Sequence, residues 1–151
     1  MHLHKLITDN FIFEAGGCID HLEIIYHTSP REYQPGDRVV WLCHALTANS
    51  DPLDWWPEMV GENCWVNPDK DYVVCVNIFG SAYGTTGPRS IEDPFAFPKF
   101  TVRDTAKLFT LVREHLGIER VDLLVGSSIG GFHALEWAIM EGDVIERAAF
   151  I

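Results

Sequence analysis

The stretch VDLLVGSSIGGFHALEWAIM, Val121 to Met140, decides the fold of this chain. An apolar run ends at a turn of small residues, and an apolar segment with helical character follows. The turn reads G-S-S-I-G, which matches the pattern G-x-S-x-G with Ser128 at its centre. In so tight a strand-to-helix turn, the central residue adopts a strained backbone conformation that presents its hydroxyl above the sheet. The pattern therefore predicts that Ser128 is a nucleophile at the end of a buried strand.

The residues around Ser128 are small, as this turn requires. Strand and helix nearly touch there, and glycine occupies three of the neighbouring positions, Gly126, Gly130 and Gly131. The helix that follows directs its positive N-terminal end at the corner, where negative charge develops during acyl transfer. The pentapeptide alone also fits a glycine-rich turn with an incidental serine. The strand before it and the helix after it favour the nucleophile.

A serine nucleophile of this kind needs two backbone N–H groups to hold the oxyanion. The residue after the nucleophile, Ile129, supplies one of them. The other comes from the loop after an earlier strand, and CHALTANSD (43–51) lies at the expected place, with Leu46 as the expected donor. His44 in the same loop is interpreted as a packed, hydrogen-bonded histidine rather than as a catalytic base.

The rest of the chain predicts an α/β fold with a mostly parallel sheet, an N-terminal antiparallel hairpin and helices on both faces. The segments FIFEAGG (11–17) and HLEIIYHTS (21–29) predict the hairpin, joined through Gly16 and Gly17. Continuous apolar runs predict buried strands; these are RVVWLCHAL (38–46), YVVCVNI (72–78), RVDLLV (120–125) and the start of another in VIERAAFI (144–151).

Two further helices are expected between these strands. A short one covers Asp54 to Val60 and carries two tryptophans. A longer one opens at Thr101, which has the capping-box spacing with Asp104, and ends at Gly117. Its apolar positions recur at intervals of three and four residues along one face: Val102, Ala106, Phe109, Val112 and Leu116.

Parallel sheets of this type bind ligands beyond the carboxyl ends of their strands. The loops to examine are therefore 44–49, 77–89 and 126–131. None of them contains G-x-G-x-x-G or a G-K-[ST] ending, so a nucleotide-binding fold is a poor fit.

Composition limits the partners and the compartment. Eleven Lys and Arg against 22 Asp and Glu give a net charge of −11, which opposes binding to nucleic acid or an anionic membrane. No apolar run approaches the ~20 residues of a membrane span, and the start has no signal-peptide core. The four cysteines show no CxxC pairing. We expect a cytoplasmic protein with no metal site.

Four blocks of sequence resemble the homoserine O-acetyltransferases in order and spacing: HALTANS (44–50), NIFGSAYGTTGPRS (77–90), FPKFTVRD (97–104) and VGSSIGGFHALEWA (125–138). The resemblance runs from about Phe11 to the end of the chain. It implies an α/β-hydrolase fold and a role in methionine biosynthesis. It also implies that Ser128 takes an acetyl group from acetyl-CoA as an ester, which the hydroxyl of L-homoserine then attacks.

The same resemblance implies the remaining site residues. Leu46 and Ile129 become the oxyanion donors, although family members usually carry Met at the second position. Asn49, Asn77 and Tyr83 line the substrate tunnel, and Arg89 or Arg103 holds an anionic substrate group. Acetyl-CoA acts as a co-substrate, and no cofactor stays bound. A homodimer of the full-length protein is left open.

The end of the chain departs from the family. In this fold, an Asp or Glu and then a His follow the nucleophile along the chain. Only 23 residues (151 − 128) follow Ser128, and their single histidine, His133, lies five positions on in the same helix. It points to another side of that helix and cannot turn back to the serine, so it is interpreted as a packed or surface residue.

We therefore expect residues 1–151 to be the N-terminal part of a single α/β-hydrolase domain, which ends after the strand that follows the nucleophile helix. The lid, the C-terminal part and the triad Asp and His are absent, and this part is expected to be inactive alone. Two alternatives remain open. One is a related serine- or homoserine-directed succinyl- or acetyltransferase, or an esterase. The other is a non-catalytic pseudoenzyme or binding module.

Overall fold

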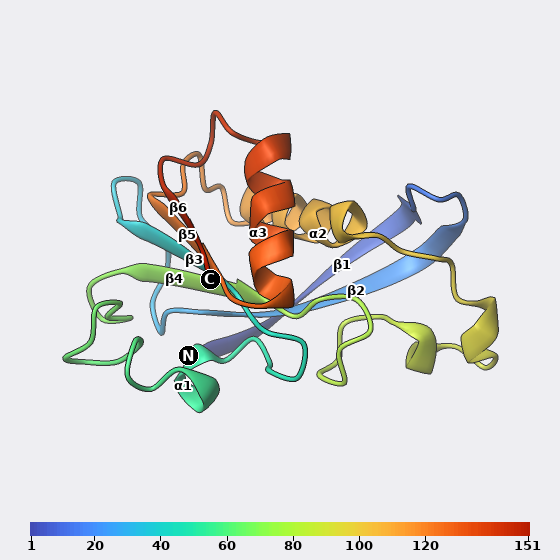
Figure 1. The fold of residues 1–151 in the computed structure, drawn as a ribbon, viewed down its shortest axis with the longest axis horizontal. Coiled ribbons are helices and arrows are strands. Elements are labelled where there is room, and N and C mark those ends of the chain that lie inside the picture. Colours follow the sequence, from blue (N-terminus) through green and yellow to red (C-terminus); the bar gives the residue numbers. More distant parts are fainter.

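The computed structural model describes residues 1–151 as one six-stranded sheet with helices packed on it (Figure 1). The strands are β1 (His2–Ile12), β2 (Cys18–Thr28), β3 (Val39–Cys43), β4 (Tyr72–Val76), β5 (Leu123–Gly126) and β6 (Ala148–Phe150). The helices are α1 (Pro52–Trp55), α2 (Val102–His115) and α3 (Ile129–Met140), with 3₁₀ turns η1 (Pro88–Ser90) and η2 (Pro94–Ala96).

The sheet has the strand order β1-β2-β4-β3-β5-β6. Strands β4, β3, β5 and β6 run parallel, whereas β1 and β2 form an antiparallel hairpin that joins β4 in antiparallel fashion. Every residue of β3, β4 and β5 is buried, as expected of strands covered on both faces. The predicted α/β class, the hairpin and the mostly parallel sheet are confirmed.

The hairpin is longer than the sequence predicted. Strand β1 begins at His2, whereas we expected the first strand to start near Phe11. Because β1 is an edge strand, most of its side chains stay at least partly exposed, and its sequence lacks the continuous apolar run of a central strand. The turn itself lies where it was expected, since Gly16 and Gly17 both adopt positive φ angles, 89° and 93°.

Helices cover both faces of the sheet, but unequally (Figure 1). Helices α2 and α3 pack together on one face. There Trp41 of β3 meets Trp137 of α3, with ring centroids 4.7 Å apart. On the other face, the segment 52–66 covers the sheet with the single turn α1, and Trp55 and Trp56 pack against the smaller core cluster.

Helix α1 runs from Pro52 to Trp55, whereas we expected a helix from Asp54 to Val60. The side chain of Asp51 caps it by accepting a hydrogen bond from the Leu53 amide, and proline fits the first helical position.

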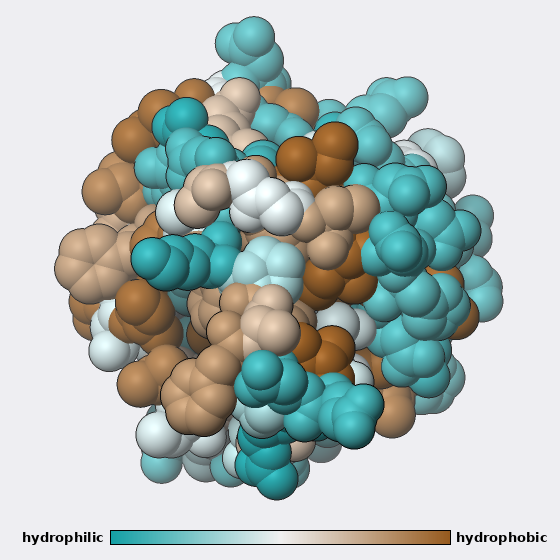
Figure 2. Space-filling view, turned by 90° about the vertical axis from the view of Figure 1, so that its right-hand side faces the viewer, coloured by the Kyte–Doolittle hydropathy of each residue, from teal (hydrophilic) through white to brown (hydrophobic).

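None of the helices combines the length and the apolarity needed to cross a membrane. Figure 2 shows the end of the molecule that carries the hairpin tip, where hydrophobic and hydrophilic side chains gather on opposite sides of the view.

The predicted capping box of α2 is present. The hydroxyl of Thr101 accepts from the Asp104 amide, and the Asp104 carboxylate accepts from the Thr101 amide at 3.0 Å. The same carboxylate accepts from the Glu14 amide at 2.9 Å and pairs with Lys107, so it ties the hairpin to the helix. At the other end of α2, Gly117 adopts a φ of 67°, as a helix C-terminus requires.

Asp104 is fully buried and makes the fold sensitive to acid. Burial alone would raise the pKa of its carboxyl, but the hydrogen bonds from Lys107 and from the Glu14 and Thr101 amides outweigh it and lower the pKa below the ordinary 3.8. A lowered pKa stabilises the fold above about pH 4, and this stabilisation is lost as the pH falls through the folded-state value.

We therefore expect Asp104→Asn to lower the free energy of unfolding by about 1.5–3 kcal/mol at pH 7, and the difference from wild type to shrink below pH 4. Urea unfolding at several pH values measures this. Asp143→Asn serves as the control, because Asp143 is exposed and makes no side-chain hydrogen bond. Equal stability of the Asp104 variant and the wild type at pH 7 would show that these hydrogen bonds contribute nothing net.

Candidate active site

Ser128 stands at the turn between β5 and α3 with φ 53° and ψ −125°. A positive φ is uncommon for a residue with a side chain and costs on the order of 1–3 kcal/mol, which the surrounding structure must offset. The side chain is exposed and does not cap α3. The Ser128 amide donates to the Ile151 carbonyl at 2.8 Å, so the turn is tied to the end of β6. The hydroxyl is therefore held in a strained corner and is free to react.

Two glycines make this corner possible. A Cβ atom at Gly130 would lie 2.2 Å from the carbonyl oxygen of Cys43, and one at Gly126 would lie 2.2 Å from the carbonyl oxygen of Gly130. Neither separation is physically possible, so both positions require glycine. At Gly131 the nearest atom, the Gly126 oxygen, would be 3.4 Å away, an ordinary contact. Glycine itself is therefore required at Gly126 and Gly130, whereas Gly131 has room for a methyl group.

The two predicted oxyanion donors lie on one cavity. Leu46, in the loop after β3, and Ile129, the first residue of α3, line the same space of about 330 Å³. No loop or cap hydrogen bond uses the amide of either residue, and the first amides of a helix have no acceptor within it. The loop and the helix terminus can therefore offer both amides to a developing oxyanion.

His44 fixes the loop that carries Leu46. Its ring is completely buried, with Nδ1 2.8 Å from the Ala45 carbonyl oxygen and Nε2 accepting from the Ile78 amide at 3.4 Å. Burial lowers the pKa of His44, and the bond to Ala45 opposes this only in part, so the ring is neutral at pH 7. The predicted interpretation as a packed, hydrogen-bonded histidine is confirmed.

Asn49, Asn77 and Tyr83 come together at a second, smaller cavity of about 220 Å³. The Asn77 amide nitrogen donates to the Tyr83 carbonyl at 3.0 Å, while its buried side-chain oxygen has no partner. His27 and Asp51 line the same cavity. The sequence analysis did not single out these two residues. His27 reaches the cavity because β2 lies beside β4, whereas Asp51 lies in the loop after β3.

The two arginines do not join this group. Arg89 is exposed on η1 and lines neither cavity. The guanidinium of Arg103 bonds to Glu136 at 2.6 Å and lies 3.7 Å from Glu14, so it connects α2 to α3 and to the hairpin. In the structure, Arg103 is thus already paired with carboxylates.

His133 is packed inside the protein. The sequence analysis expected either a packed or a surface residue at this position. It is only 4% exposed, contacts Phe109 edge to face, and lines the cavity of Leu46 and Ile129. Burial, and then the neighbouring His44, lower the pKa of His133 to about 4. It is therefore neutral at pH 7, and the sequence analysis missed its place on the cavity.

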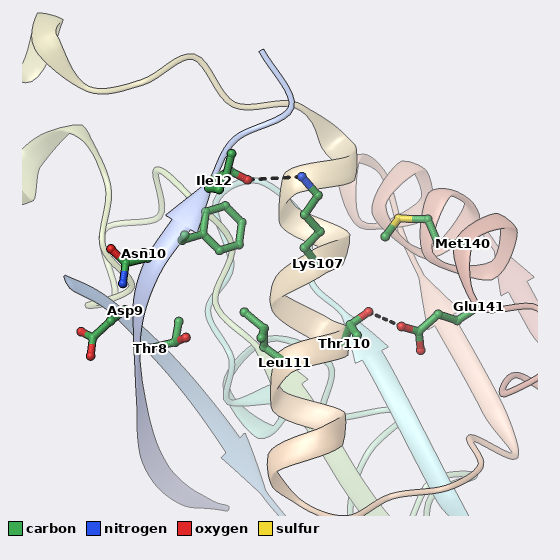
Figure 3. A pocket seen from close by; sticks show the side chains of 10 residues that line it. Thr8, Asp9, Asn10, Ile12, Lys107, Thr110, Leu111, Met140 and Glu141 are labelled. Carbon is green, nitrogen blue, oxygen red and sulfur yellow. Dashed lines mark hydrogen bonds between the residues drawn. The ribbon is translucent and has the colours of Figure 1, made fainter. Parts of the chain in front are cut away.

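Another cavity, of about 470 Å³, lies elsewhere, between the end of β1 and the helices (Figure 3). Lys107 reaches across it to the Ile12 carbonyl at 3.4 Å, and Thr110 bonds to Glu141 on its far side. None of its lining residues belongs to the nucleophile turn or to the loop after β3. No group of three or more His, Cys, Asp or Glu side chains is placed to hold a metal ion.

A serine held at a positive φ between a buried parallel strand and a helix has the geometry typical of the nucleophile turn of α/β hydrolases. Residues 38–151 match the alpha/beta hydrolase fold family, and the chain belongs to that family.

Among its relatives, the homoserine O-acetyltransferase of Nostoc punctiforme is 38% identical over 149 residues, which cover 95% of this chain and 42% of that protein. The chain thus spans less than half the length of the curated relatives it matches. The crystal structure of homoserine O-acetyltransferase from Staphylococcus aureus superposes with a TM-score of 0.83 at 27% identity, covering 97% of this chain and 45% of that one. Esterase E22 shares the fold, with a TM-score of 0.84 at 23% identity over 97% of this chain and 46% of its own.

Proposed function

We propose that this chain is the nucleophile-bearing part of an acyltransferase that moves an acetyl group from acetyl-CoA to the hydroxyl of L-homoserine. The observation that carries the proposal is Ser128 in its strained turn, with Leu46 and Ile129 on one cavity beside it. The relatives named homoserine O-acetyltransferase support acyl transfer and this choice of acceptor. By the same resemblance we place the protein in methionine biosynthesis, and its four free cysteines favour the cytoplasm.

The reaction proceeds in two displacements. The Ser128 oxygen attacks the thioester carbonyl, the C–S bond breaks, and a base passes the serine proton to the departing CoA thiolate. The homoserine hydroxyl then attacks the seryl ester, and its proton returns through the base to Ser128. In each step the carbonyl oxygen becomes an anion, which the amides of Leu46 and Ile129 stabilise together with the positive end of α3.

The base and the acid that orients it belong, in this proposal, to residues beyond 151. The only histidine after Ser128 is the buried, neutral His133, which sits within α3. The surface of α3 also indicates that further residues pack against this helix. Phe132, Leu135 and Ile139 form an exposed apolar stripe on α3, although a helix that is apolar on all sides is normally buried. Asn49, Asn77 and Tyr83 are proposed to contact substrate at the second cavity.

The test is an assay of the full natural polypeptide, with purified residues 1–151 as the comparison. We expect O-acetylhomoserine and free CoA to form in equal amounts with the full polypeptide, and no turnover with residues 1–151. Serine, succinyl-CoA and water replace the substrates one at a time. Faster reaction with succinyl-CoA or serine would identify a related transferase, hydrolysis alone an esterase, and no reaction of the full polypeptide a non-catalytic binding protein.

A further inference from the structure

The cavity beside the oxyanion donors has walls that are mostly apolar and carry no charged side chain. Leu46 and Ile129 border it, together with Ile78, Phe79 and Phe100. Its volume of about 330 Å³ falls within the roughly 300–1,000 Å³ typical of cavities that enclose small ligands. A two-carbon acetyl group leaves much of this space unfilled.

Three polar side chains interrupt the apolar lining: Thr101, Thr105 and His133. The Thr101 hydroxyl already bonds to Glu14 and Asp104, so the other two matter here. Thr105 of α2 is 1% exposed and His133 of α3 is 4% exposed, and both line the cavity. Neither the Thr105 hydroxyl nor the His133 ring bonds to another protein group. Nδ1 of His133 is buried without a hydrogen-bond partner. These two groups therefore face the cavity as uncharged hydrogen-bonding groups.

Ser128 does not itself line this cavity, but the adjacent Ile129 does, so an acyl group on Ser128 starts at the border of the cavity. When the acyl carbonyl oxygen lies between the Leu46 and Ile129 amides, the acyl carbon is one bond away, at the border of the cavity that both residues line. The rest of the acyl chain extends from that carbon. Burying a carboxylate among walls without a cation is costly, so the cavity disfavours a succinyl chain and suits uncharged chains.

We propose that this cavity is the acyl pocket of the enzyme, that it admits short uncharged acyl chains longer than acetyl, and that the His133 ring sets the greatest chain length. The inference rests on the proposed function, because it requires acylation of Ser128.

The test uses the full natural polypeptide and p-nitrophenyl esters of acetate, butyrate and hexanoate. The Ser128 oxygen bonds to the acyl carbon, the bond to p-nitrophenolate breaks, and the serine proton passes through the base to solvent. Release of nitrophenolate and the mass of acylated Ser128 report the step, and homoserine is not needed. We expect the wild type to accept butyrate about as well as acetate.

Two variants change the size of the side chain at position 133 in opposite directions. His133→Ala removes it and is expected to raise the hexanoate-to-acetate rate ratio roughly tenfold or more. His133→Phe is bulkier and is expected to lower the butyrate-to-acetate ratio by a similar factor. Loss of packing alone would slow all esters together and could not give opposite shifts. His115→Ala, which removes an exposed histidine of α2, controls for the loss of a histidine.

The outcomes separate the two proposals. In one outcome, Ser128 is acylated while the hexanoate-to-acetate and butyrate-to-acetate rate ratios of both variants equal those of the wild type. That result overturns the role of His133 and leaves the proposed function standing. If the Ala variant fails to fold, the Phe variant alone decides, because an unchanged butyrate-to-acetate ratio overturns the inference. If no ester acylates Ser128 in a wild-type protein that forms O-acetylhomoserine from acetyl-CoA, the inference falls and the proposed function stands. If the wild type reacts with neither acetyl-CoA nor the esters, both proposals fall.

Discussion

Ser128→Ala in the full polypeptide is expected to lower kcat/KM for homoserine acetylation by a factor on the order of 10⁴ or more. Ser128 is the residue of the turn between β5 and α3 that has a positive φ and is the proposed nucleophile, and the proposed oxyanion amides have nothing to stabilise without a covalent adduct. The fold should survive, since the hydroxyl makes no capping bond. Steady-state rates and the mass of the acetylated protein measure the loss.

Ser127→Ala is the matched control, because Ser127 is the adjacent serine of the same turn and contributes its carbonyl to the Gly130 amide through the backbone alone. We expect its activity to stay within a few-fold of wild type. An acetylated Ser128→Ala protein, or activity equal in both variants, would mean that Ser128 is an incidental turn residue and that another group accepts the acetyl.

The parts of the fold that the sequence predicted well are those fixed by local chemistry. The capping box of Thr101 and Asp104 formed as expected, because its two bonds join residues only three positions apart. The strained turn at Ser128 followed from the glycines around it, since two of them allow strand and helix to meet. Continuous apolar runs identified the central strands because burial on both faces leaves no polar position.

Features that depend on distant neighbours could not be read in this way. The length of β1 depends on pairing with β2, since an edge strand keeps polar residues on both faces. The cavity at His133 forms only when α2, α3 and the loops after β3 and β4 meet, and no spacing along the chain encodes that meeting. The pairing of Arg103 with Glu136 is another example, because it requires α2 and α3 to lie side by side.

Gly130→Ala is expected to lower the free energy of unfolding by about 3 kcal/mol or more, with loss of activity. The added methyl group would overlap the Cys43 carbonyl, which belongs to the backbone of β3 and cannot rotate away. Relief requires α3 to move off the sheet, and that movement removes the packing that holds Ser128 at its positive φ. Urea unfolding followed by circular dichroism gives the change in stability.

Gly131→Ala is the matched control one residue further along the same helix. Its methyl group would meet the Gly126 oxygen at 3.4 Å without overlap, and alanine favours a helix over glycine by about 1 kcal/mol. We therefore expect this variant to be as stable as wild type or slightly more stable. If Gly130→Ala matched it in stability, β3 and α3 would not be in backbone contact at this turn. The contact between β3 and α3 would then not be what holds Ser128 at its positive φ, and the proposed nucleophile would lack this support.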